Sequence, residues 1–337
     1  MKTPAPWLSI LLPVYGVEPY VMACAESILS QADAGVELVF VDDVSPDGSA
    51  ALLAALQAAH PEQVRVLHHA VNSGISAARN TLLDAAHGDY LWFIDPDDLM
   101  EPDALAALKA VIDVHAPDWV VCDFRAFDDK TGLARRARHA HQSTFSGPDN
   151  VRSEDTDLLI RGLLQAGQLH PWSKVIRRST WPTALRFPIG RVFEDLAVFP
   201  RLALQARSYF YAPQVWVAYR QRPGSTLANL TAAKLDDWTR ALVGCGDLLR
   251  DSSAETRFVA AHFSARTFVR AAQRLTRLGI ADTPATLTQF AQRWQAASPL
   301  SASELLRRYL RRGWWWRALH FAFWLRRAHY KASSKVS

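Results

Sequence analysis

The N-terminal part of the chain alternates short apolar runs with longer stretches of helical periodicity. Each apolar run has the length of a buried strand, and each helical stretch has one apolar face, as Val21, Cys24 and Ile28 show in the first. This alternation predicts βαβ units and a mostly parallel sheet. The predicted strands are 8–15, 36–41, 64–67 and 89–94, and the predicted helices are 20–31, 50–59 and 76–87.

Two of these strands run directly into acidic residues. Asp42 and Asp43 follow one strand, and the sequence Asp95-Pro96-Asp97-Asp98 follows another. The carboxyl ends of parallel strands share one edge of a sheet, where open α/β sheets bind their ligands. Clustered carboxylates repel one another unless a cation or donors neutralise them. Oxygen ligands of this kind suit Mg²⁺ or Mn²⁺ shared with substrate phosphates.

Both acidic sets also have a purely structural interpretation. Asp97 and Asp98 can belong to a solvated turn, with an Asp as helix N-cap near Pro102. Asp42-Asp43 precedes Ser45-Pro46-Asp47-Gly48, which is a good turn sequence. The two interpretations are compatible if Asp42 lies in a site and Asp43 or Asp47 in the turn.

Seven blocks of sequence carry a resemblance to a known family. They are 9–15 (SILLPVY), 41–49 (VDDVSPDGS), 72–80 (NSGISAARN), 95–98 (DPDD), 172–178 (WSKVIRR), 187–196 (FPIGRVFEDL) and 219–225 (YRQRPGS). Their order and spacing resemble those of the family 2 glycosyltransferases, over roughly residues 7–226. The resemblance implies the GT-A fold, an α/β fold with a Rossmann-like, mostly parallel sheet flanked by helices.

The resemblance also implies where the nucleoside of a nucleotide-sugar donor would bind. The loop after the first strand, with Pro13, Val14, Tyr15 and Glu18, would border the nucleoside. Asp42 would contact its base. Gly16 and Val44 stand where the family commonly has Asn and Gly, which affects loop geometry more than the site.

The rest of the implied donor site lies further along the chain. Arg79 would reach the nucleotide, and Asp95 and Asp97 would bind the ribose and the metal–diphosphate, with Mn²⁺ or Mg²⁺ as the metal. Asp98 would lie toward the donor sugar or the acceptor. For Arg79 the alternative is that its aliphatic stem covers its own helix.

The pair Glu194-Asp195 supplies the candidate catalytic residues, and the resemblance implies that Asp195 is the base. An acceptor hydroxyl must lose its proton, and a metal stabilises the departing diphosphate as a Lewis acid. One base and one metal suit a single displacement with inversion, without the carboxylate nucleophile of retaining hydrolases. The alternative is an N-cap followed by a first-turn acid.

Composition bounds the organisation of the 337 residues. Three scattered cysteines, without a CxxC pair, indicate a reducing cytosol, and we expect no secretory signal and no membrane-spanning run.

We expect a GT-A domain over 1–226, with a nucleotide-binding half (1–125) and an acceptor-side half (126–226). A helical extension over 227–303 and a basic, aromatic, amphipathic tail over 304–337 would follow. A basic stretch, 128–141, is predicted to form an exposed loop or hairpin.

The net charge of +5 is concentrated in the tail, where Glu304 is the only acid. Arginine-rich helical faces with Trp314-Trp315-Trp316 suit the headgroup zone of an anionic membrane. The alternative is a helical hairpin packed on the enzyme. No DNA- or RNA-binding module accompanies the charge, so we expect no nucleic-acid partner.

The sequence therefore predicts a metal-dependent inverting glycosyltransferase, peripheral on the cytoplasmic face of the cell membrane. Its donor would be a nucleotide sugar, with a UDP-sugar favoured, and its acceptor a cell-surface glycan or a lipid-linked acceptor. A pyrophosphorylase or a dehydrogenase is disfavoured, because no Gly-rich loop follows the first strand. A catalytically degenerate, membrane-associated binding module is the alternative.

Overall fold

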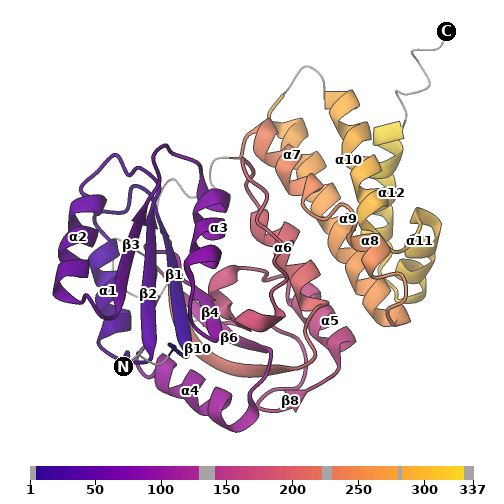
Figure 1. Ribbon diagram of the computed structural model, residues 1–337. Coiled ribbons are helices and arrows are strands. Elements are labelled where there is room, and N and C mark those ends of the chain that lie inside the picture. The colour runs from indigo at the N-terminus through magenta and orange to yellow at the C-terminus, as the bar shows by residue number, and fades with distance from the viewer. Residues whose placement is uncertain (1–4, 129–140, 222–229, 280–282, 330–337) are drawn as a thin grey trace.

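Strands and helices alternate in the N-terminal part of the protein, as the periodicity predicts (Figure 1). The computed structural model describes residues 5–128, 141–221, 230–279 and 283–329. The predicted elements are confirmed, with ends shifted by two residues or fewer. They are β1 (Leu8–Val14), α1 (Val21–Leu29), β2 (Val36–Asp42), α2 (Ser49–Ala59), β3 (Val64–His68), α3 (Ile75–Ala85) and β4 (Tyr90–Phe93).

The middle of the chain extends the same sheet. Its elements are β5 (Leu99–Met100), α4 (Ala104–His115), β6 (Trp119–Asp128), β7 (His141–Gln142), β8 (Arg152–Ser153), α5 (Thr156–Ala166), η1 (Pro171–Ser173), β9 (Lys174–Arg177), η2 (Arg178–Thr180), α6 (Glu194–Ala203) and β10 (Tyr209–Gln221). Of the basic stretch 128–141, residues 129–140 lie outside the described residues. Its flanking strands β6 and β7 pair antiparallel.

Within the described residues, one sheet contains all ten strands, in the order β3-β2-β1-β4-β9-β6-β10-β5, with β7 on β6 and β8 on β10. β1 to β4 pair in parallel, as do β6 and β10, whereas β9 runs antiparallel to both of its neighbours. The chain winds outward from β1 through β2 to β3, and β4 then returns to the other side of β1. The gap between β1 and β4 is thus a topological switch point, where sheets of this kind bind ligands.

Helices cover both faces of the sheet, so the strands are apolar on both sides. Ile10 and Leu12 of β1 face a core shared with α1, α2 and α4. Leu11, pointing the opposite way, faces a second core that contains α3, α5 and α6. That second core continues beyond α5 and α6 into the C-terminal helices.

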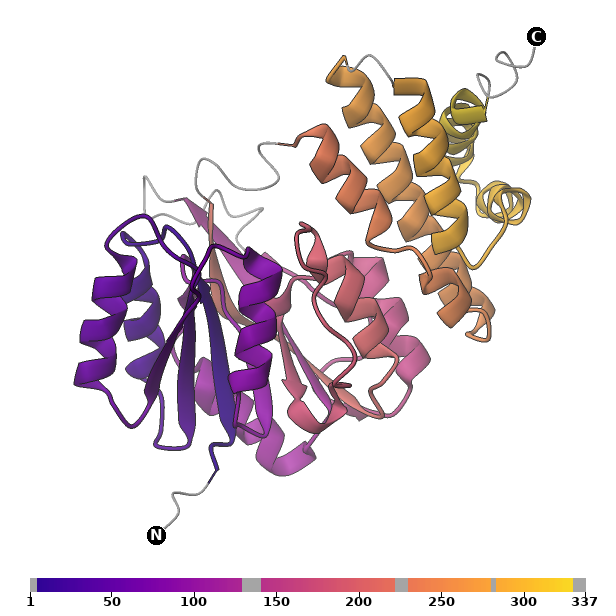
Figure 2. The same cartoon turned by 45° about the horizontal axis from the view of Figure 1, so that its top comes forward.

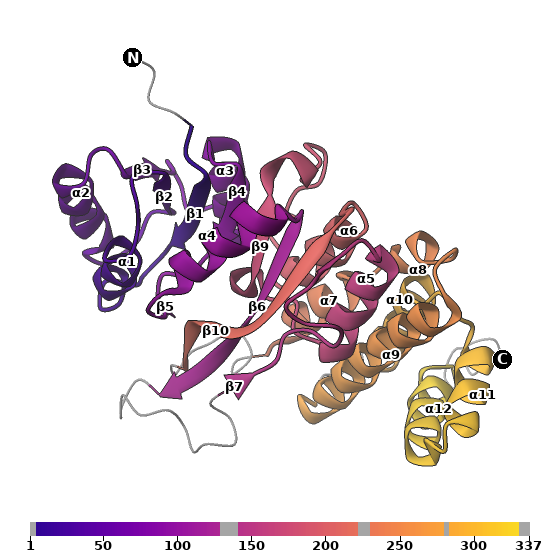
Figure 3. The ribbon, with the colours of Figure 1, turned by 90° about the horizontal axis from the view of Figure 1, so that it is seen from below.

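The C-terminal helices stack beside the sheet on the side of α5 and α6 (Figures 1 and 2). Their bounds are α7 (Ala232–Arg240), α8 (Cys245–Leu248), α9 (Ala254–Arg277), α10 (Thr283–Ala297), α11 (Ala302–Arg311) and α12 (Trp315–His329). A capping box in which Ser301 and Glu304 exchange hydrogen bonds starts α11. Seen from below, α11 and α12 form the edge of the bundle farthest from α1 and α2 (Figure 3).

The predicted tail forms part of this bundle. Leu305 and Tyr309 of α11, and Phe321 and Trp324 of α12, are buried in the second core. The alternative of a packed helical hairpin therefore holds for the described part of the tail, which ends at His329. None of the helices in the described residues combines the length and the apolar character needed to span a bilayer.

Candidate active site

A cavity of about 580 Å³ opens at the carboxyl ends of β1 and β4, beside the switch point. Asp43, after β2, lines this cavity, and six further segments that are far apart in the sequence meet there. They are 13–17 after β1, 72–79 around the start of α3, 95–97 after β4, 170–172 before β9, 192–195 at the start of α6, and Tyr219-Arg220 near the end of β10. The cavity is thus shared between the two predicted halves of the catalytic domain.

The acidic turn after β4 divides its carboxylates between the cavity and the interior. The Asp98 amide donates to the carbonyl of Asp95 at 3.0 Å, so these four residues form a tight turn. Asp95 and Asp97 line the cavity. Asp98 is fully buried, and its Oδ1 accepts the backbone N–H of Arg220 at 2.8 Å. Burial raises the pKa of Asp98 well above its usual value, and the charges of Asp95 and Asp97 raise it further.

A second contact ties the same turn to β10. Arg220 Nε donates to the carbonyl of Asp97 at 2.7 Å, and its guanidinium lies 4.6 Å from the ring centre of Phe127. Asp98 and Arg220 therefore clamp the acidic turn to the end of β10. The resemblance implied that Asp98 lies toward the donor sugar or the acceptor. In the structure its carboxylate instead accepts the backbone N–H of Arg220.

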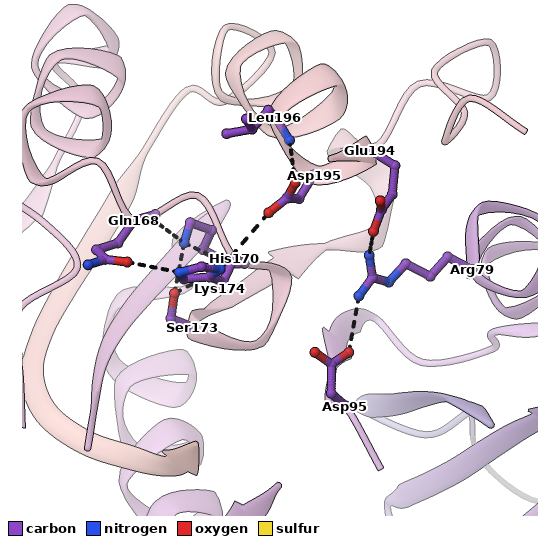
Figure 4. A network of polar contacts seen from close by, with 9 residues as sticks. All are labelled: Arg79, Asp95, Gln168, His170, Ser173, Lys174, Glu194, Asp195 and Leu196. Atoms are coloured by element: carbon purple, nitrogen blue, oxygen red, sulfur yellow. Dashed lines mark hydrogen bonds and ion pairs between the residues drawn. The ribbon is translucent and has the colours of Figure 1, made fainter. Parts of the chain in front are cut away.

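Arg79 joins two of the predicted site elements (Figure 4). Its Nη2 donates to Asp95 Oδ1 at 3.0 Å, and its Nη1 pairs with Glu194 Oε1. The Arg79 side chain is only 5% exposed, so these are buried, charge-assisted contacts. Burial lowers the pKa of Arg79, but its carboxylate neighbours outweigh burial, and the net pKa is raised. Arg79 thus links the acidic turn after β4 to the start of α6.

The loop before α3 positions Arg79. Asp43 accepts hydrogen bonds from the backbone N–H groups of Ser73 and Gly74, at 2.9 and 2.7 Å. Gly74 has φ of +83°, a conformation that glycine adopts without a steric penalty. The carboxylate of Asp43 therefore fixes the start of α3, and with it the direction of Arg79.

Asp195 lies at the opposite wall of the cavity. Its Oδ1 accepts the backbone N–H of Leu196 at 2.8 Å, and its Oδ2 lies 4.0 Å from His170 Nδ1 (Figure 4). Burial, followed by the charge of Glu194, raises the pKa of Asp195 to about 7, against the opposing effects of nearby cations and of the amide. Its side chain is 19% exposed. A carboxylate with such a pKa is suited to accept a proton near neutral pH.

Lys174 supports the loop that carries His170. The lysine is fully buried, and its Nζ donates to the carbonyls of Gln168 and His170 and to Ser173 Oγ, at 2.7 to 2.9 Å (Figure 4). Burial lowers the pKa of Lys174 to about 7. Burial, followed by the charge of Lys174, lowers the pKa of His170 to about 3, so His170 is neutral. The ring of His170 stacks on Trp172, with centroids 4.8 Å apart.

The predicted site residues fall into two groups. Eight of them line the cavity: Pro13, Val14, Tyr15, Arg79, Asp95, Asp97, Glu194 and Asp195. Three do not line it: Glu18, Asp42 and Asp98. Glu18 accepts the backbone N–H of Gly48, and Asp42 accepts that of Ser45, so both carboxylates hold the turn after β2.

The lining residues that had no role assigned from the sequence include four with large side chains: His170, Trp172, Tyr219 and Arg220. Trp172, Tyr219 and Arg220 belong to blocks that resemble the family, but the resemblance gave them no function. The signal that points to them is topological. Their blocks adjoin β9 and β10, strands that lie on the β4 side of the sheet.

The donor set for a metal consists of two carboxylates. In the described residues, no three His, Cys, Asp or Glu side chains form a cluster able to hold a metal ion. Asp95 and Asp97 both line the cavity. Mg²⁺-type sites commonly use one or two carboxylates, completed by water and substrate phosphates. The two residues therefore fit a metal shared with a bound diphosphate.

Comparison with known proteins identifies the family. Residues 9–172 match the family described as Glycosyl transferase family 2. Glycosyltransferase GlyA of Streptococcus pneumoniae serotype 4 is 28% identical over 237 residues, which are 70% of this chain and 33% of GlyA. The chain thus spans a third of the length of this curated relative.

Two solved structures share the fold. S. aureus TarS residues 1–349, in complex with UDP-GlcNAc, has a TM-score of 0.67 at 20% identity, over 94% of this chain and 90% of that one. Mannosyltransferase PcManGT from Pyrobaculum calidifontis, in complex with GDP-Man and Mn²⁺, has a TM-score of 0.53 at 16% identity, over 98% and 92%. The predicted GT-A fold is confirmed. On its sequence blocks, its fold and its relatives, the chain belongs to glycosyl transferase family 2.

Proposed function

We propose that the protein transfers a sugar from a nucleotide-diphosphate donor to an acceptor hydroxyl, with inversion at the anomeric carbon. One observation carries the proposal: Asp195, with a pKa near neutrality, lines the same cavity as Asp95 and Asp97. A base and two carboxylates able to bind a metal, around one cavity, suit the two charges that develop during sugar transfer. These are the proton lost by the acceptor and the negative charge gained by the diphosphate.

The donor side of the cavity is assigned to the loop after β1 and the acidic turn. Pro13, Val14 and Tyr15 border the nucleoside, while Asp95 and Asp97 face the diphosphate. A divalent metal bound there, Mn²⁺ or Mg²⁺, would neutralise the charge that develops on the leaving group. PcManGT, which shares the fold, binds GDP-Man with Mn²⁺.

Asp195 takes the acceptor proton. The acceptor oxygen forms its bond to the anomeric carbon as the bond from that carbon to the diphosphate oxygen breaks, and the hydroxyl proton passes to Asp195 Oδ2. Oδ1 is held by the amide of Leu196, which leaves Oδ2 for the proton. Glu194 is paired with Arg79 and therefore serves as a positioning residue. On the described cavity wall around α6, only Asp195 is then available for chemistry, because Glu194 is paired. One available carboxylate favours a single displacement over a covalent intermediate.

The relatives support a proposal for the donor class and for the acceptor. TarS binds UDP-GlcNAc, which supports a UDP-sugar as the donor here. Curated relatives include the minor teichoic acid biosynthesis protein GgaB of Bacillus subtilis, which supports a cell-surface glycan or lipid-linked acceptor. We propose the cytoplasmic face of the membrane as its location, because synthesis of such acceptors uses nucleotide sugars.

A donor screen tests this function. We expect one class among UDP-, GDP-, CDP- and dTDP-sugars to raise the melting temperature with Mn²⁺, and the same donor to release nucleoside diphosphate on turnover. Turnover should fall to background in a chelator. If a donor binds with metal but no nucleoside diphosphate is ever released, the chain is a binding module and the proposed transfer is wrong.

We also propose that the protein binds anionic membrane through α12. Four large apolar side chains are exposed along one side of this helix, although its other side is packed on the bundle. They are Trp315, Trp316, Leu319 and Phe323, with exposures of 63%, 78%, 65% and 54%. We call this set the α12 ridge. Exposed aromatic residues beside arginines suit the interface of an anionic bilayer.

Replacing the α12 ridge residues by Ser should abolish binding to vesicles that contain anionic lipid, because apolar insertion is lost. The melting temperature should stay close to that of the wild type, since these side chains are exposed. Val114→Ser is a matched control, because Val114 is 74% exposed on α4, far from the ridge in the sequence. Equal vesicle binding by the ridge variant and the control would exclude this surface.

A further inference from the structure

A second cavity, of about 420 Å³, lies between α9 and α12. We call it the arginine groove. Arg266 and Arg270 enter it from α9, and Arg317 enters it from α12. Its other polar walls are His262, Gln273, Tyr309 and His320. None of these residues belongs to the catalytic cavity.

The three arginines face one another without acidic partners. In the part of the chain that the structure describes, no carboxylate forms an ion pair with any of them. Arg266 is half-buried, and burial followed by the charges of Arg270 and Arg317 lowers its pKa. Like charges held together in a partly desolvated groove are costly unless an anion neutralises them.

The surrounding sequence makes this arrangement unusual. Residues 254–329 contain thirteen arginines and three acids. Glu255 pairs with Arg312, and Glu304 is used in the capping box of α11. The third acid, Asp282, lies outside the described residues. The two described acids are thus engaged elsewhere, and the groove has a concentrated positive charge.

The neutral groups of the groove are already paired, so the arginines remain the donors for a ligand. His262 Nδ1 lies 2.9 Å from the Tyr309 hydroxyl, and Gln273 Nε2 lies 2.9 Å from His320 Nε2. Burial, followed by the neighbouring arginines, lowers the pKa of His262 to about 4, so this ring is uncharged at neutral pH. Guanidinium groups bind phosphate oxygens in a bidentate geometry, which makes a phosphate the anion of best fit.

An apolar surface adjoins the groove and identifies the source of the phosphate. His320, in the groove wall, stacks on Trp316 of the α12 ridge, with ring centroids 6.5 Å apart. Arg317 itself lies over the ring of Trp314, 4.1 Å from its centre. A ligand that spans both surfaces has a phosphate next to an apolar body. A membrane phospholipid has this form, and free phosphate does not.

We propose that the arginine groove binds the phosphate headgroup of an anionic phospholipid while the α12 ridge inserts beside it. This inference rests on the proposed membrane association and refines it from general attraction to a defined headgroup site. Arg266 and Arg270 lie outside the predicted tail, so the site combines a helix of the extension with a helix of the tail.

The test compares two triple variants that remove the same charge. One is Arg266→Gln, Arg270→Gln and Arg317→Gln in the groove. The control is Arg307→Gln, Arg311→Gln and Arg326→Gln, three exposed arginines of α11 and α12 that do not line the groove. Binding to phosphatidylcholine vesicles with and without phosphatidylglycerol is measured by co-sedimentation. The groove triple should lose at least about tenfold more affinity for the anionic vesicles than the control, because defined guanidinium–phosphate contacts exceed general attraction.

Further measurements distinguish the lipid site from general electrostatic attraction and from a site for soluble phosphate. If the two triple variants lose affinity for anionic vesicles equally, binding depends on net charge alone and the proposed headgroup site is wrong. If millimolar inorganic phosphate stabilises the wild type but not the groove triple, while both triples bind vesicles equally, the ligand is soluble phosphate and the lipid assignment is wrong. Should the triple melt early, the single variant Arg270→Gln, at an exposed position, replaces it. Release of nucleoside diphosphate, measured without vesicles, tests the transferase proposal separately.

Discussion

Asp195→Asn should reduce the turnover number by about two orders of magnitude or more, with donor affinity nearly unchanged. The substitution keeps the shape of the side chain, and its amide oxygen can still accept the N–H of Leu196 at the start of α6. It removes only the group that accepts the acceptor proton. Steady-state kinetics for turnover and calorimetry for donor binding separate these effects. A fall in donor affinity without a fall in turnover per bound donor would make Asp195 a binding or capping residue.

The pH dependence of this variant provides an independent check. Because the pKa of Asp195 is raised to about 7, wild-type turnover should fall as the pH decreases below about 7, where the carboxylate becomes protonated. Asp195→Asn should lack this acid limb. A wild-type profile that stays flat down to pH 5 would contradict the assignment.

The same raised pKa has a consequence for stability. The folded state binds a proton at Asp195 more tightly than the unfolded chain, where the pKa is near 3.8. The free energy of unfolding therefore declines as the pH rises from about 4 to 7. Above that range the full destabilisation by the buried, charged carboxylate is present. At pH 8 the Asn variant should melt at or above the wild-type temperature, which would mark Asp195 as a functional rather than a structural acid.

Asp97→Ala should abolish transfer and remove Mn²⁺-dependent nucleotide binding. It deletes one of the two cavity carboxylates that suit a hard cation, and a metal shared with the diphosphate then lacks a protein ligand. Calorimetry with the nucleotide, with and without Mn²⁺, measures the loss. Asp113→Ala on α4 is the control, because its exposed carboxylate pairs only with Lys109 in the described structure.

Two results would contradict the metal role of Asp97. One is wild-type turnover by Asp97→Ala, and the other is full wild-type turnover in a chelator. Asp98→Ala offers a contrast, because it removes the oxygen that accepts the Arg220 N–H and clamps the acidic turn to β10. Its main effect should be a lower melting temperature and not a lost metal dependence.

Local pattern was sufficient to predict the strands and helices of residues 8–94. The apolar runs and helical faces of residues 8–94 are local signals, so strands and helices could be placed within two residues. Asp95, Asp97 and Asp195 could be found because they stand at strand and helix ends within recognisable blocks. Their shared cavity confirms that these blocks converge in space, although it does not test their roles.

Side-chain direction and partner choice could not be predicted, because they depend on contacts distant in the sequence. Arg79 faces Glu194, 115 positions away, and Asp98 binds Arg220, 122 positions away. Nothing near Asp42 or Asp43 indicates which of the two lines the cavity, and it is Asp43. In the tail, the same amphipathic pattern fits a bilayer or a protein core. Only the packing shows that α11 and α12 bury one face in the bundle.

The continuous second core limits how the protein can be divided. A single apolar cluster runs from Leu11 in β1, through Phe199 in α6, to Phe321 in α12. A boundary near residue 226 separates sequence motifs, but it cuts through shared packing. The part of the chain before this boundary is thus not an interchangeable module, and a chimera that grafts it onto a foreign extension must supply a complementary apolar surface for α5 and α6.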